Sequence, residues 1–186
     1  MLNLPRLLTP LLVLLGIAAG CAPAGSPQLR QAVESGNVDD VVAALEAIKA
    51  IVTTDDDRQI TAIDLSRLFE YVHINFTDAD VDQLGLLRGK RKLDRIESLD
   101  LTFSRALTDK SCRTIGQLPS LKSLSLQRVP ITDAGLASLV SLKELETLDL
   151  GFTQVTSSGM KHLSRSRRIN FLFLTREWPT WQVCRS

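Results

Sequence analysis

The stretch LKSLSLQRVPITDAGLASLVSLKELETLDLGFTQVT, residues 121–156, contains one pattern twice. Leucines at 121, 124 and 126 give the spacing L-x-x-L-x-L, and leucines at 145, 148 and 150 give it again, 24 residues later. The phrase Ile131-Thr132-Asp133 returns as Val155-Thr156-Ser157 at the same offset. A fixed period of roughly 20–50 residues is the sequence signature of a chain built from stacked repeats.

The same pattern continues on both sides of this stretch. Further copies begin at Ile60, Ile96 and Ile169. In the first copy the Thr-Asp phrase comes late, at Thr77, which indicates an insertion over residues 67–76. The sequence therefore predicts an array of five repeats over residues 58–177.

The two periods within a repeat predict its structure. Alternate residues of a strand face opposite sides, so Leu124 and Leu126 point inward while Ser125 and Gln127 point outward. Thr132 or Asp133 then caps a short helix whose leucines face back onto the strands. Strands pack more closely than helices, so such an array curves. We predict an α/β solenoid with a short parallel sheet on the concave side and short helices on the convex side.

Residues 28–57 have a different pattern, which predicts a helical cap over the N-terminal end of the array. Leu29, Ala32 and Val33 have helical spacing, and Asn37 is placed to cap a second helix. Solenoid ends need such a polar-faced cap. The acidic run at 53–57 is expected to be a turn or linker, because it lacks the spaced oxygen ligands and the glycine of a calcium loop.

The N-terminus carries an export pattern. Arg6 precedes an apolar run at 7–19, which ends in Gly20-Cys21. A basic start, a short apolar run and small residues before a cleavage site are typical of a secretory signal peptide. Removal of Arg6 with the signal leaves 21 basic against 21 acidic residues, so no global field attracts nucleic acid.

Residues 18–21, Ala-Ala-Gly-Cys, resemble the lipobox of bacterial lipoproteins, although leucine is usual where Ala18 stands. The resemblance implies that residues 1–20 are removed and that Cys21 becomes the lipidated first residue, with 21–27 as a tether. Two or more acyl chains anchor a protein stably. Ala22, in place of the aspartate that retains such proteins at the inner membrane, favours an outer-membrane location. The alternative is an ordinary cleaved signal followed by an incidental cysteine.

The repeats at 60–177 resemble the leucine-rich repeat superfamily. The Thr-Asp-x-Gly-Leu phrase is similar to the ribonuclease-inhibitor-like and cysteine-containing repeats, and to repeat proteins of environmental Gram-negative bacteria. The resemblance implies a protein-binding surface without catalysis. The family often has Asn or Cys at the turn after the strand, where this chain has Ser104, Val129 and Thr153. Serine and threonine side chains can still bond the neighbouring backbone, but the Val129 side chain cannot, so an irregular turn is expected there.

The concave face is the predicted binding site. Its residues for partner binding are Asp64, Asp100, Ser125, Gln127, Asp149, Phe171 and Phe173. These form a small, mildly acidic groove with an aromatic end, suited to a basic or hydroxyl-rich partner. The alternatives are that aspartate in L-D-L is simply solvated, and that Phe173 packs under the C-terminal residues.

Two other surfaces compete with this groove. Basic residues lie at two turns that would stack along one edge, which could contact anionic lipid or remain a solvated edge: Arg88, Lys90, Arg91, Lys92, Arg165, Arg167 and Arg168. At the C-terminus, residues 178–186 form a predicted cap in which Trp178 and Trp181 cover the last strand, or else an aromatic platform.

No catalytic, cofactor or metal site is predicted. His73 and His162 form no Ser–His–Asp or Cys–His spacing, and the chain has no CxxC and no glycine-rich phosphate loop. Cys112 takes an inward helix position, and both Cys112 and Cys184 are expected to be free thiols because three repeats would separate them.

The sequence thus predicts a non-catalytic, lipid-anchored protein of the bacterial cell envelope that binds a protein partner. The alternative is a structural envelope protein that binds glycan or peptidoglycan. An intracellular adaptor is disfavoured by the export signal. The neutral charge and the export signal argue against nucleic acid as a partner.

Overall fold

The computed structural model describes residues 25–67, 76–86, 95–164, 166 and 168–174. The predicted signal peptide, Cys21, most of the insertion, Cys184 and the predicted C-terminal cap lie outside these residues. So do all but one of the basic residues singled out above.

The predicted pair of N-terminal helices is present. Helix α1 spans Pro27–Ser35 and helix α2 spans Val38–Ala47. The Ser26 hydroxyl accepts a hydrogen bond from the first turn of α1, and the Asn37 side chain caps α2, as predicted. Between them Gly36 has φ 67°, a left-handed conformation that glycine adopts at little cost.

The prediction of a turn or linker at 53–57 is wrong in its first half. Strand β1, Ile51–Thr54, pairs antiparallel with strand β2, Ile60–Asp64. All four residues of β1, Ile-Val-Thr-Thr, are β-branched, and such side chains favour an extended backbone. The sheet is therefore extended at its N-terminal edge by a hairpin and is parallel only from β2 onward.

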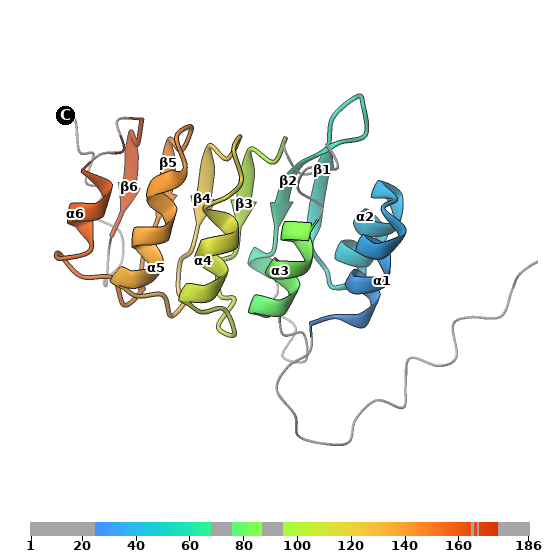
Figure 1. Cartoon of the computed structure of the whole chain (residues 1–186), viewed down its shortest axis with the longest axis horizontal. Coiled ribbons are helices and arrows are strands. Elements are labelled where there is room, and N and C mark those ends of the chain that lie inside the picture. The colour runs from blue at the N-terminus through green and yellow to red at the C-terminus, as the bar shows by residue number, and fades with distance from the viewer. Residues whose placement is uncertain (1–24, 68–75, 87–94, 165, 167, 175–186) are drawn as a thin grey trace, which may run out of the picture.

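Within the described residues, six strands form one sheet in chain order. After β2 come β3 (Ser98–Asp100), β4 (Ser123–Ser125), β5 (Thr147–Asp149) and β6 (Phe171–Phe173), all parallel to β2. The helices between them are α3 (Asp78–Leu86), α4 (Asp109–Ile115), α5 (Asp133–Ser138) with the 3-10 turn η2 (Leu139–Ser141), and α6 (Met160–Leu163). The described helices lie on one side of the sheet (Figure 1).

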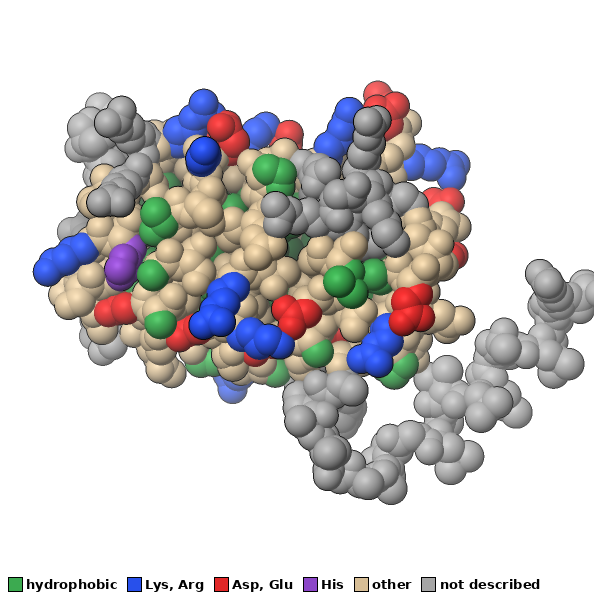
Figure 2. All heavy atoms as spheres, viewed as in Figure 1, with side chains coloured by type: hydrophobic (Ala, Val, Ile, Leu, Met, Phe, Trp, Pro, Cys, Tyr) green, Lys and Arg blue, Asp and Glu red, His purple; other side chains and the backbone are tan. Residues whose placement is uncertain are grey.

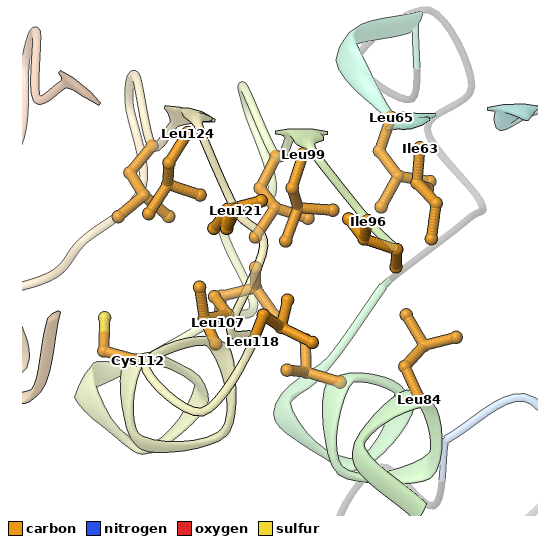
Figure 3. Packing of buried hydrophobic residues seen from close by; sticks show 14 of the residues in the cluster. Ile63, Leu65, Leu84, Ile96, Leu99, Leu107, Cys112, Leu118, Leu121 and Leu124 are labelled. Atoms are coloured by element: carbon orange, nitrogen blue, oxygen red, sulfur yellow. The ribbon is translucent and has the colours of Figure 1, made fainter. Parts of the chain in front are cut away.

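The core lies between the sheet and these helices, as the leucine spacing predicts. The central strand residues Leu99 and Leu124 point toward Leu107, Leu118 and Cys112 on the helix side (Figure 3). All five are at most 7% exposed. The inward position of Cys112 is thus confirmed, and burial raises the pKa of its thiol to about 12. The thiol is therefore protonated and unreactive at neutral pH.

The turn after each strand forms without the asparagine or cysteine that is frequent there in leucine-rich repeats. The Val129 N–H donates to the Leu126 carbonyl at 3.1 Å, and equivalent backbone bonds hold the turns at Ser104 and Thr153. Val129 itself is fully buried. Backbone hydrogen bonds and burial therefore maintain the turn, and the expectation of an irregular turn at Val129 is wrong. The Ser104 hydroxyl, which was expected to bond the backbone, is buried without a partner in the described part of the chain.

An aspartate–threonine ladder joins successive helix starts. In each case one aspartate accepts from the backbone N–H and the hydroxyl of a threonine one repeat later: Asp78 from Thr108, Asp109 from Thr132, and Asp133 from Thr156. The threonine also caps its own helix, as at Thr132, where the hydroxyl accepts from the Ala134 N–H at 3.2 Å. Of the two capping residues considered from sequence, threonine is the cap and aspartate links the repeats.

The ladder has an electrostatic consequence. The side chain and backbone of Thr156 hold the pKa of the Asp133 carboxyl below its usual value. Because the folded-state pKa is lowered, the contribution of Asp133 to stability is present at neutral pH. It is lost as the pH falls through that lowered pKa.

Candidate functional site

The sheet face opposite the helices carries most of the residues predicted to bind a partner. We call it the helix-free face and define it by the outward strand residues Ala62, Asp64, Ser98, Asp100, Ser123, Ser125, Thr147, Asp149, Phe171 and Phe173. Each is half-buried or exposed, while the residue between each pair is buried in β2 to β5 and half-buried in β6. This alternation is typical of a sheet with one packed and one open face. Strand pairing brings Asp64, Asp100, Ser125, Asp149 and Phe173 into one row, as predicted.

The three aspartates of this row are held in place rather than freely solvated. Each carboxylate accepts the backbone N–H two residues further along, at 2.7 Å for Asp64 and 2.8 Å for both Asp100 and Asp149. These bonds complete the end of each strand and fix the direction of the carboxylate. The aspartates therefore have a structural role, and their remaining lone pairs still face the open side of the sheet.

The environment of Asp149 disfavours its charged form. Partial burial, and to a smaller extent the negative charge of Asp100, raise the pKa of its carboxyl, against the lowering effect of the Gly151 N–H. One strand, with Ser125, separates the two carboxylates. The Ser125 hydroxyl bonds that of Thr102 at 2.8 Å. A cationic group bound between Asp100 and Asp149 would relieve this repulsion.

The aromatic end of the face is exposed. Phe171 is 50% exposed and Phe173 is half-buried. Leu174, which occupies the position of the buried Leu126 and Leu150 in the earlier repeats, is 46% exposed. It lines an open hollow of about 240 Å³ together with Phe152 and Met160. A buried leucine at this position would need a following segment to pack against, and Leu174 is the last of the described residues.

The predicted basic edge carries acidic residues as well. Arg168 forms an ion pair with Glu144, and Lys122 pairs with Glu97 at 2.9 Å. The other basic residues of that edge lie outside the described residues. On the helix-covered face, too, basic and acidic side chains are intermixed (Figure 2), as in the pair Lys110–Asp82 at 2.6 Å. His162 is exposed on this face.

Sequence reasoning missed a cluster at the turns beside this face. Phe103, Arg128 and Phe152 are each the second residue after the last inward leucine of a strand. The Arg128 guanidinium carbon lies 5.1 Å from the centre of the Phe103 ring and 4.4 Å from that of Phe152. The repeat offset of 25 and then 24 residues would have aligned these three positions, but they fall outside the strand and helix patterns.

The described residues contain neither a metal-binding group of side chains nor a membrane-spanning helix. Within them, no group of three or more His, Cys, Asp or Glu side chains could hold a metal ion. None of the helices described there combines the length and the apolar character needed to cross a bilayer.

With this geometry in view, the comparisons with known proteins identify the type of repeat. A family model described as Leucine Rich repeat matches residues 143–164, which contain β5 and α6. The chain therefore contains a leucine-rich repeat, within a mixed α/β arrangement compatible with that class, and the motif suggests a role in protein–protein interaction. None of the curated proteins compared with the chain matches it.

Proposed function

We propose that this chain is a non-catalytic solenoid of leucine-rich repeats whose helix-free face is its concave surface and binds a protein partner. The observation that carries the proposal is the row Asp64, Asp100, Ser125 and Asp149, which is open and polar. Backbone N–H groups fix its aspartates, and the Thr102 hydroxyl bonds its serine. A preorganised row of this kind loses little conformational entropy when a ligand binds.

The partner presents a basic side chain to Asp100 and Asp149. Partial burial, and to a smaller extent the charge of Asp100, raise the pKa of Asp149, so a basic group of the partner placed beside it would stabilise its charged form. Phe171, exposed at the end of the neighbouring row on the same face, is available as an apolar anchor. Aromatic anchors beside a polar patch are typical of residues that dominate binding energy.

We also propose that Cys21 is acylated and holds the repeats at the bacterial envelope, at the outer membrane. The sequence 18–21 and the apolar run before it support this part. A second candidate for the ligand is envelope glycan or peptidoglycan, which the small hydroxyl side chains Ser98, Ser123 and Thr147 beside the acidic row would suit.

The test is covalent capture from envelope extract of the source organism by the full chain in detergent. The double variant Asp100→Arg/Asp149→Arg is expected to recover at least about tenfold less partner, since like charges facing each other at an interface cost several kcal/mol. The matched control Glu34→Arg/Glu46→Arg makes the same charge change on exposed residues of α1 and α2. It should capture as the wild type does.

Two results would count against the proposal. Equal capture by both double variants would remove the function from this face. Loss of the captured material after glycosidase or lysozyme digestion, but not after protease treatment, would replace the protein partner with glycan. Asp100→Asn/Asp149→Asn keeps the acceptor oxygens and so separates loss of charge from loss of fold.

A further inference from the structure

The turns beside the helix-free face clamp one arginine between two aromatic rings. Phe103, Arg128 and Phe152 come from three successive repeats, and backbone bonds tie the turns together. The Phe103 N–H donates to the Gln127 carbonyl at 2.9 Å, and the Arg128 N–H donates to the Gly151 carbonyl at 2.8 Å. The guanidinium carbon lies 5.1 Å from the centre of the Phe103 ring and 4.4 Å from that of Phe152, so rings from the preceding and the following repeat both contact the guanidinium and its N–H groups are what it offers a ligand.

The backbone conformation at these residues is one that bulky side chains rarely adopt. Their φ angles are 64° at Phe103, 59° at Arg128 and 58° at Phe152. Glycine or asparagine takes this left-handed conformation with less strain, so the fold alone favours small residues here. Strain that is retained at one repeated position is a reason to look for a role in binding.

Arg128 also lacks the acidic partner that a structural arginine usually has. Among the residues that the structure describes, no carboxylate lies within ion-pair distance of its guanidinium. Arg105, exposed in the same turn as Phe103, likewise has no acidic partner there. The turns therefore carry positive charge next to the negative row of Asp64, Asp100 and Asp149.

From these observations we infer that Arg128 is a binding residue for a carboxylate of the protein partner. The inference rests on the proposed function and adds a second contact to it. A guanidinium edge offers two parallel N–H donors in one plane, which matches the two oxygens of a carboxylate. The contacts with the two rings restrict the movement of the guanidinium, so less conformational entropy is lost when it binds a ligand. The partner segment would present a basic residue to the aspartates and an acidic group to Arg128.

The test uses peptides selected by display on the wild-type full chain. Each selected peptide is synthesised as the parent, with each Asp or Glu changed to Asn or Gln, and with an amidated C-terminus, so that side-chain and terminal carboxylates are distinguished. Affinities are measured for the wild type, Arg128→Gln, and the matched control Arg105→Gln. We expect removal of one carboxylate to weaken binding at least tenfold on the wild type and on Arg105→Gln, but less than twofold on Arg128→Gln.

A second variant distinguishes binding from folding. Arg128→Lys keeps the charge and loses the planar fork, so it should also bind at least fivefold more weakly while melting at the wild-type temperature. An equal effect of carboxylate removal on wild type and Arg128→Gln would overturn the inference. If those peptides still depend on Asp100 and Asp149, the proposed function survives that result. If the selected peptides need Arg128 but bind Asp100→Arg/Asp149→Arg as tightly as the wild type, the inference about Arg128 stands and the proposed function is contradicted. Failure to select any peptide would contradict both.

Discussion

Replacing Gly116 with alanine is expected to lower the free energy of unfolding by about 3 kcal/mol, near the upper end for an added methyl group in a packed site. A Cβ at this position would lie 2.3 Å from the backbone carbonyl oxygen of Ser138, in the next repeat. That oxygen belongs to the main chain, so it cannot rotate away. The Ser141 hydroxyl also donates to the Gly116 carbonyl, and this contact would be strained.

Urea unfolding of the full chain, followed by circular dichroism, measures the effect. Ala137→Ser on the exposed side of α5 is the control and should stay within about 0.5 kcal/mol of the wild type. A Gly116→Ala protein as stable as this control would show that the close approach of α4 to the following repeat is unimportant for stability.

The second large effect is a coupling between Gly135 and Asp109. The Asp109 carboxylate accepts from the Thr132 N–H at 2.7 Å and from its hydroxyl at 2.6 Å. A Cβ at residue 135 would lie 2.4 Å from one of the same carboxylate oxygens. Gly135→Ala should therefore displace Asp109 and cost about 2–3 kcal/mol, as should Asp109→Ala, which removes both hydrogen bonds directly.

The double variant should be little less stable than Asp109→Ala alone, because the clash disappears with the carboxylate. The expected coupling is at least about 1 kcal/mol in a double-mutant cycle. Gly135→Ser is an internal control: the preceding repeat already has Ser111 at this position, and its hydroxyl donates to Asp78. Serine should thus cost less than alanine. If the free-energy costs of Gly135→Ala and Asp109→Ala are additive, the aspartate–threonine ladder is not the reason that residue 135 is glycine.

Much of this fold could be predicted from the period of the sequence. The leucine spacing predicted the strands from β2 to β6 and the side of the sheet on which the core lies. Capping at Asn37 and Thr132 followed from local chemistry. Strand β1 was missed because Ile51–Thr54 follows a helix and carries no repeat pattern, so its pairing with β2 depends on tertiary packing.

The site was predictable only in its outline. Strand alternation placed Asp64, Asp100 and Asp149 in one row, but it could not show that their carboxylates bond the local backbone. The clamp on Arg128 was missed for a related reason. Contacts between turns of different repeats depend on how the repeats stack, and the period gives their order without giving the directions of their side chains.

Site-specific photo-crosslinking tests the central claim, partner binding on the helix-free face, most directly. A benzophenone amino acid is placed at Ser123 on β4 or at Thr147 on β5, both on that face, and at Ala137, exposed on α5. Full chains carrying each substitution are irradiated in envelopes of the source organism. The account predicts one protein adduct of the same mass from Ser123 and from Thr147, and none from Ala137. An adduct from Ala137 alone would place the partner on the helices and contradict it.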